Sequence, residues 1–273
     1  MQMIINIFIK TFGGIIFELK NVYKFRYVTY SFVNTSLKFR YRRSYLGFFW
    51  TVLAPMLHYV IMGLVFTMLM GSRRPDYFAY YFSGALFFAL ISGVLNRATI
   101  AFLVNEHFIK KIYVPKLNFI LNAVGIELVN FVLSGSSLIL LGILTSYFKF
   151  SGYIFLAAIP VILAAVALTG ISCILAVATV YFRDFINITP VVIQAAFFAT
   201  PVIYDESMVP AKYIWVMDWN PVYYFLRAFR LPLMEQTVPS VDLYLFITGF
   251  SLFFILSGLL ILMKFDNRIA FKL

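Results

Sequence analysis

Residues 38–57 read KFRYRRSYLGFFWTVLAPML. Four basic side chains, those of Lys38, Arg40, Arg42 and Arg43, have no acidic neighbour in this stretch. An apolar segment containing a glycine, a tryptophan and a proline follows them without a linker. Dense positive charge beside an apolar run is typical of the cytoplasmic edge of a membrane span, where anionic lipid headgroups attract it. The stretch therefore predicts an interfacial segment that leads into a first transmembrane helix.

The composition of the whole chain agrees with an all-α polytopic membrane protein. Of its 273 residues, 63% are hydrophobic and only 12% are charged, which lies far from the composition of a soluble domain. At about 20 apolar residues per span, six transmembrane helices fit. The predicted spans are 46–70, 77–104, 117–147, 153–181, 188–204 and 241–263.

The lysines and arginines predict the orientation of these spans. With six spans both termini face the same side, and the loops on that side carry fifteen lysines and arginines, against six on the other. Because positively charged loops are retained in the cytoplasm, both termini are expected there. This asymmetry also explains the net charge of +11 without a nucleic-acid partner, for which no motif is present.

Two segments differ from simple spans. In the cytoplasmic segment 1–45, Phe25, Val28, Phe32 and Phe39 recur near helical spacing among basic residues, which predicts an N-terminal amphipathic interfacial helix with its apolar side in the lipid. The alternative is a cytosolic helix. Segment 205–240 is rich in proline and aromatic residues, which predicts two short re-entrant outer helices before the last span, divided near Asn220–Pro221.

The chain lacks the motifs of an enzyme or a metal site. Gly13 and Gly14 are not followed by the lysine and hydroxyl residue of a Walker A loop, so the chain is not expected to bind or hydrolyse ATP. His58 and His107 lie too far apart to share a metal with the single cysteine, Cys173. No carboxylate pair has the spacing of an acid and base, so we expect no catalytic residues.

Two ionisable residues, Arg97 and Glu127, lie well inside predicted spans. At 1.5 Å per residue, their depths from the inner membrane edge are ~11 and ~15 Å. Adjacent spans at similar depth predict an intramembrane ion pair that holds two helices in register. A proton relay or a substrate contact is the alternative, and Arg97 could also extend its side chain to the inner interface.

Four stretches, in this order and spacing, resemble the ABC-2 type permeases of the polysaccharide, O-antigen, capsule and teichoic acid exporter family. They are KFRYRRSYLGFFWTVLAPML, EHFIKKIYVPKLNFIL, YFRDFINITPVVIQAAFFATPVIYDESMVP and DWNPVYYFLRAFRLPLM. Together they cover most of the chain from Lys38 to Met234. The resemblance implies a homodimer of six-span subunits (46–273) in the bacterial inner membrane, driven by two copies of a separate ABC ATPase subunit that binds ATP and Mg. It also implies that the substrate is a glycan linked to polyprenyl diphosphate.

The resemblance further implies roles for particular residues. A coupling helix at about 105–113 would present Glu106, His107, Lys110 and Lys111 to the ATPase. The outer gate, within 205–240, would include Trp219, Asn220, Pro221 and Arg227. The entrance for the lipid-linked substrate would lie at Leu46 and Gly47. Arg40, Arg42 and Arg43 are placed there as ligands of the diphosphate, because the guanidinium fork matches phosphate oxygens; a simple lipid anchor is the alternative.

A channel for saccharides needs flat surfaces against which sugar rings can stack, and aromatic side chains provide them. The candidates are Phe66, Phe87, Phe88, Phe197, Phe198 and Tyr204. For each of them, ordinary packing against the protein or lipid is the alternative.

The leading hypothesis is therefore the transmembrane subunit of an ATP-driven exporter of an O-antigen-like polysaccharide. A teichoic acid or capsule exporter permease is the nearest alternative. A permease for small hydrophobic compounds would not need the arginine cluster. A membrane glycosyltransferase or polymerase would normally carry clustered carboxylates or a soluble loop, and the predicted cytoplasmic loops are short.

Overall fold

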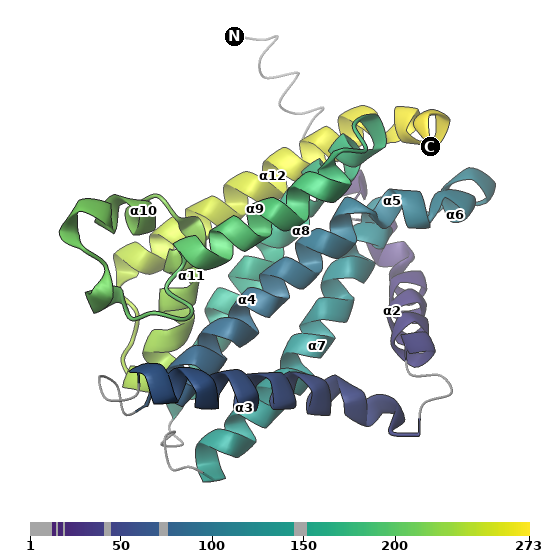
Figure 1. Ribbon diagram of the computed structural model, residues 1–273. Helices are drawn as coiled ribbons and strands as arrows, with labels where there is room; N and C mark the ends of the chain where they lie inside the picture. The colour runs from purple at the N-terminus through teal and green to yellow at the C-terminus, as the bar shows by residue number, and fades with distance from the viewer. Residues whose placement is uncertain (1–12, 15, 19, 41–44, 71–75, 145–151) are drawn as a thin grey trace.

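The computed structural model describes residues 13–14, 16–18, 20–40, 45–70, 76–144 and 152–273. These residues form helices joined by short turns, with no β-strand among them, which confirms the all-α class (Figure 1). The long helices are α3 (Trp50–Met70), α4 (Tyr77–Thr99), α7 (Leu117–Leu144), α8 (Ala158–Tyr181), α9 (Phe185–Ala199) and α12 (Val241–Lys272).

Shorter elements connect the long helices. The short α-helices are α2 (Arg26–Arg40), α5 (Ala101–Val104), α6 (Glu106–Lys111), α10 (Ile214–Asp218) and α11 (Pro221–Arg230). Short 3-10 helices lie at η1 (Gly47–Phe49), η2 (Gly152–Ala157), η3 (Glu206–Met208) and η4 (Ala211–Tyr213), and a π-helix, η5 (Leu231–Glu235), continues α11.

Within the part of the chain that the structure describes, four helical segments are long and apolar enough to cross a membrane, so the chain is a multi-pass membrane protein. They are Tyr77–Thr99, Leu117–Leu140, Gly152–Tyr181 and Val241–Lys272. The first predicted span corresponds to α3, which has 21 residues, and the fifth to the shorter apolar helix Phe185–Ala199. The 15 residues of α9 rise only ~22 Å. A count of six spans stays a prediction.

Several predicted ends differ from the observed ones. The second predicted span, 77–104, is divided between α4, which ends at Thr99, and α5. The fifth apolar helix ends at Ala199 and not at 204, because Thr200 precedes Pro201 and takes an extended conformation (ψ 137°) that ends the helix. The last helix continues to Lys272, beyond the predicted end at 263. Its final residues are charged, and charge ends an apolar span without ending a helix.

Helices α8 and α12 pack along each other over much of their length. Their closest approach is at Gly170 and Gly258, where a Cβ on Gly170 would overlap the Phe254 carbonyl and a Cβ on Gly258 would overlap the Gly170 backbone. Small residues allow this backbone contact, which is how helices gain packing energy where lipid offers no hydrophobic driving force.

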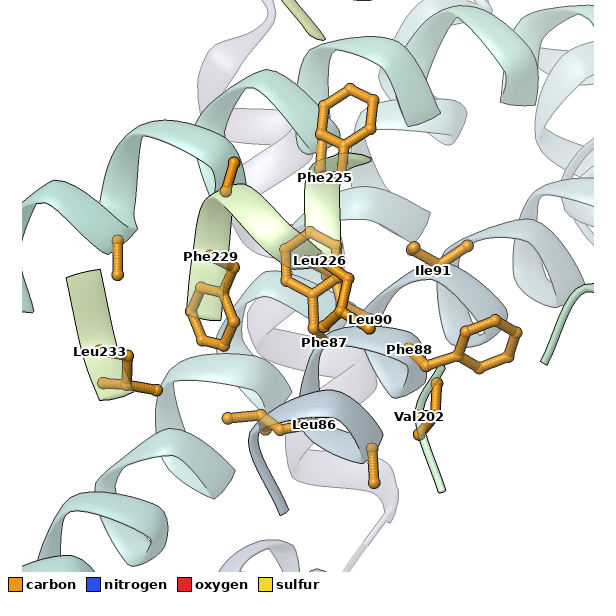
Figure 2. Packing of buried hydrophobic residues seen from close by; sticks show 14 of the residues in the cluster. Leu86, Phe87, Phe88, Leu90, Ile91, Val202, Phe225, Leu226, Phe229 and Leu233 are labelled. Carbon is orange, nitrogen blue, oxygen red and sulfur yellow. The ribbon is translucent and has the colours of Figure 1, made fainter. Parts of the chain in front are cut away.

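Buried aromatic and aliphatic side chains form the core around α4. Phe87, which is fully buried, packs against Phe229 of α11 with ring centroids 5.1 Å apart (Figure 2). Phe88 meets Phe197 of α9 edge to face at 5.0 Å. The core thus fixes α9 and α11 against α4. A second cluster includes Phe102, Phe119 and Cys173, which is fully buried.

The helix α2 differs from the prediction in the surface that covers its apolar side. Phe32 packs against Phe119 of α7 (centroids 5.8 Å apart) and Phe108 of α6 (5.4 Å), so part of this side faces protein and not lipid. Asn118 of α7 also donates a hydrogen bond to the Thr29 hydroxyl (2.7 Å). Phe39 is 60% exposed, and Tyr27 and Tyr30 of the same helix are about 70% exposed.

Candidate functional site

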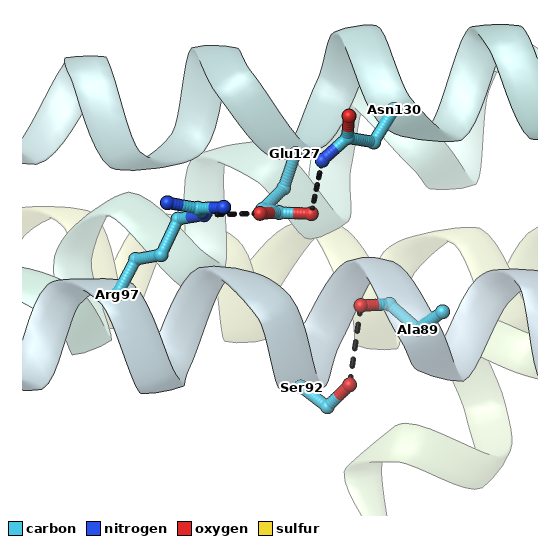
Figure 3. A network of polar contacts seen from close by, with 5 residues as sticks. All are labelled: Ala89, Ser92, Arg97, Glu127 and Asn130. Atoms are coloured by element: carbon cyan, nitrogen blue, oxygen red, sulfur yellow. Dashed lines mark hydrogen bonds and ion pairs between the residues drawn. The ribbon is translucent and has the colours of Figure 1, made fainter. Parts of the chain in front are cut away.

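Arg97 and Glu127 meet between α4 and α7. The Arg97 Nε donates to Glu127 Oε1, and the Asn130 amide donates to Glu127 Oε2 at 2.8 Å (Figure 3). The Glu127 side chain is 12% exposed and that of Arg97 is 38% exposed. Gly93, one turn before Arg97, leaves the space that the carboxylate occupies. The sequence did not indicate Asn130, although its spacing from Glu127 puts both on one helix face.

The predicted coupling residues share the short helix α6. None of its residues is buried. The Lys110 ammonium contacts the Glu106 carboxylate at 2.6 Å, an i,i+4 pair, and this hydrogen bond is the main reason why the pKa of Glu106 lies below its usual value. The Phe108 ring attaches α6 to α2, and His107 and Lys111 are exposed. The helix thus presents a charged surface.

The predicted outer gate contains a helix start fixed by Asn220. Its side-chain oxygen accepts from the Val222 N–H (3.0 Å) and its amide donates to the Thr200 hydroxyl (2.8 Å). α11 begins at Pro221, where the missing N–H costs nothing. Asn220 therefore caps α11 and joins it to the end of α9. Trp219 is 84% exposed, and Arg227 is exposed, with its guanidinium 3.5 Å from the Tyr223 hydroxyl.

Sequence analysis missed Arg230, which is only 6% exposed. Its guanidinium donates to the carbonyls of Pro201 (2.6 Å), Tyr80 (3.0 Å) and Val202 (3.3 Å) and lies over the Tyr80 ring, 3.6 Å from the centroid. Gly84 leaves room for it, since a Cβ there would overlap the guanidinium. An arginine at the end of a strongly amphipathic helix looks like a surface residue in the sequence, and only the fold reveals its burial.

The structure describes only some residues of the predicted substrate entrance. Arg42 and Arg43 lie outside the described residues, and Arg40 is the last residue of α2. Leu46 is 47% exposed. Gly47 has a positive φ of 47°, which favours glycine, and it begins the turn that leads into α3.

The six candidate channel aromatics do not share one environment. Phe87 is enclosed in the core, and Phe88 (7% exposed) packs on Phe197, so in this conformation both have packing roles. Phe66 packs against Tyr77 and Tyr81. Phe198 is 61% exposed, and the Tyr204 hydroxyl donates to its carbonyl (3.0 Å). A channel role for these residues stays a prediction.

Across the described parts of the chain, no group of three or more histidine, cysteine, aspartate or glutamate side chains is placed to hold a metal ion. The described site residues thus fall in three places: the charged helix α6, the segment around α11 with the buried Arg230, and the Arg97–Glu127 ion pair between α4 and α7. A protein-family profile described as "ABC-2 type transporter" matches residues 27–234. The chain belongs to this family.

Relatives with assigned names are similar to this ABC-2 transporter over most of its length. The O-antigen export system permease protein RfbA of Klebsiella pneumoniae is 28% identical over 240 residues, which is 87% of this chain and 91% of the relative. The RfbA of Myxococcus xanthus is also 28% identical, covering 82% and 86%. The polysialic acid transport protein KpsM of Escherichia coli is 21% identical, covering 72% and 78%.

The unequal exposure of the ion pair in this ABC-2 transporter predicts unequal mutational effects. Arg97→Met leaves the buried Glu127 charge without its partner, and we expect a loss of about 1–3 kcal/mol in unfolding free energy. This is less than for a fully buried pair, because the Arg97 side chain is only partly buried. Glu127→Gln should cost less, since the arginine that loses its partner is the less buried of the two. Arg97→Met combined with Glu127→Leu should recover part of the loss in micelle unfolding experiments; no recovery would contradict the pairing.

Arg230 and Arg227 of the same ABC-2 transporter offer a matched comparison. Arg230 reaches these carbonyls through two separate guanidinium nitrogens, which the single ammonium of Arg230→Lys cannot reproduce, and we expect about 1–3 kcal/mol of destabilisation for each buried acceptor that loses its partner. Arg227→Lys, on the exposed side of α11, should change stability by less than about 0.5 kcal/mol. Thermal unfolding, with trypsin cleavage after Lys212 as a local readout, measures both. Equal losses would show that Arg230 has no special role.

Proposed function

We propose that the chain is the transmembrane subunit of an ATP-driven exporter that moves a polyprenyl-diphosphate-linked, O-antigen-like polysaccharide across the bacterial inner membrane. The observation that carries the proposal is the match of most of this chain to most of the length of two O-antigen export permeases. The family match over residues 27–234 places the chain among transporters. Export of a capsule or teichoic acid is the nearest alternative, and the more distant match to KpsM gives it some support.

The proposed complex has two copies of this chain and two copies of an ABC ATPase. The chain has no Walker A loop, so ATP and Mg would bind to the partner. Both termini would face the cytoplasm, as the excess of lysine and arginine on that side favours. A permease for small compounds or a membrane glycosyltransferase has less support, because the relatives named above are polysaccharide transport proteins.

Helix α6 is proposed as the contact with the ATPase. It joins α4 and α5 to α7, so a force on it reaches two long helices directly. His107, Lys110 and Lys111 are exposed in the isolated chain, whereas Phe108 attaches the helix to α2 through Phe32. A short charged helix held at its base can transmit motion between a soluble partner and the spans.

A charge swap within α6 tests this contact. Glu106→Lys combined with Lys110→Glu retains an i,i+4 pair and the net charge, although this order of charges is somewhat less stable. It reverses the pattern that the ATPase would meet, so we expect export and substrate-stimulated ATP turnover to fall several-fold. Insertion and dimer assembly should persist. Lys272→Glu at the end of α12 is the control and should have little effect. Unchanged turnover in the swapped complex would exclude α6 as the coupling element.

The arginine cluster tests the substrate. If Arg40, Arg42 and Arg43 grip a diphosphate, lysine in all three positions keeps the charge and loses the bidentate geometry. We then expect normal insertion and assembly but impaired surface glycan and impaired substrate-stimulated ATPase activity. Cells lacking the gene should retain the glycan inside, measured by fractionation and glycan staining. Full export by the triple lysine variant would show that the three arginines act only as a lipid anchor. Surface glycan in the deletion strain would refute the proposed function itself.

A further inference from the structure

A cavity of about 420 Å³ lies between α3, α4 and α7. This volume is within the ~300–1,000 Å³ range typical of small-molecule sites. Its lining combines aromatic side chains with four polar ones. The residues that matter here are Trp50, His58, Tyr59, Glu127, Asn130 and Ser134.

The polar lining comes mainly from one face of α7. Glu127, Asn130 and Ser134 are separated by three and four residues and therefore lie above one another on that face. His58 lines the same cavity from α3. Glu127 is about ten residues from the inner end of its helix, which at 1.5 Å per residue is ~15 Å deep. Polar groups at such depth face cavities or protein and mark functional positions.

The charge balance of the cavity favours an uncharged ligand. Glu127 is already bound by Arg97 and by the Asn130 amide, so its negative charge is compensated. A phosphate would approach this carboxylate and be repelled. A cation would have to compete with the Arg97 guanidinium. A neutral group with several hydroxyls could instead hydrogen-bond to carboxylate, amide and imidazole without disturbing the ion pair.

The aromatic lining suits the other surface of such a ligand. Trp50, the first residue of α3, lines the cavity and is 38% exposed. Tyr59, which is 6% exposed, and Phe131 enclose its interior. Flat aromatic faces beside a few fixed polar groups match the apolar C–H patches and the hydroxyls of a sugar ring.

We propose that this cavity is a binding site for an uncharged sugar ring of the exported glycan, one in each copy of the chain. The inference rests on the proposed function and adds a site to it, separate from the six candidate channel aromatics. Trp50 follows the turn that begins at Gly47, so the cavity starts beside the predicted substrate entrance. A ring held there would be partly desolvated while its hydroxyls keep their hydrogen bonds.

Photo-crosslinking in cells that carry the complete transporter tests this site. The photoreactive residue p-benzoylphenylalanine replaces Phe131, which lines the cavity, or Phe253 of α12, which is 65% exposed and serves as a matched control. After irradiation the chain is purified under denaturing conditions, and attached sugar is detected by periodate oxidation and hydrazide labelling. We expect several-fold more sugar at position 131 than at 253. Equal labelling, or a lipid adduct without sugar at 131, would overturn the proposal.

A cavity-filling variant provides the second measurement. Ala54 lines the cavity, so Ala54→Phe should occupy the space of the ring and lower both the adduct at 131 and the rate of export several-fold. Its thermal stability should match that of the parent chain. Undiminished export and labelling with the cavity filled would show that it holds only water. If the sugar site is refuted, loss of surface glycan in the deletion strain would still support the proposed function. Failure of the site and failure of the proposed function are therefore distinguishable.

Discussion

The structure depends on one constraint, the need to satisfy every buried backbone N–H and C=O where no water is available. Helices meet this need internally, which is why they dominate the described chain. After α9 the backbone is no longer helical, and side chains from other helices donate the hydrogen bonds that its carbonyls need. The carbonyls of Pro201, Val202, Ile203 and Tyr204 accept from Arg230, Tyr77 and Tyr80, with donor distances of 2.6–3.3 Å.

This capture of four consecutive carbonyls also attaches the backbone that follows α9 to two other helices. Tyr77 and Tyr80 belong to the first turn of α4, whereas Arg230 ends α11. The irregular backbone therefore joins two helices that are distant in sequence. Asn220 adds a third attachment through Thr200. The backbone after α9 is thus held by hydrogen bonds to a few side chains, whereas α8 and α12 are held by direct backbone contact at Gly170 and Gly258.

The sequence predicted the positions of the helices better than the environments of their side chains. Apolar runs placed all six long helices, and Asn220–Pro221 placed the start of α11, because these signals are local. The pairing of Arg97 with Glu127 was accessible because depth along a span follows from residue number. The burial of Arg230, the packing of Phe32 on α7 and the cavity beside α3 depend on how distant helices cross. The periodicity of a sequence carries no information about how distant helices cross. The predicted role of Arg42 and Arg43 stays a prediction, because both lie outside the described residues.

The Arg97–Glu127 ion pair carries a desolvation cost that its effect on stability alone does not explain. Replacing a buried ion pair with apolar side chains of similar size is often neutral or stabilising, so stability alone gives no reason for a carboxylate at position 127. Helix register could be fixed by shape, as Gly170 and Gly258 fix it between α8 and α12. The carboxylate does provide a fixed acceptor, oriented by Arg97 and Asn130, on the wall of a cavity. In the proposed sugar site, a ligand hydroxyl bound to this carboxylate would offset the energetic cost of the ion pair, and Glu127 would then serve transport as well as folding.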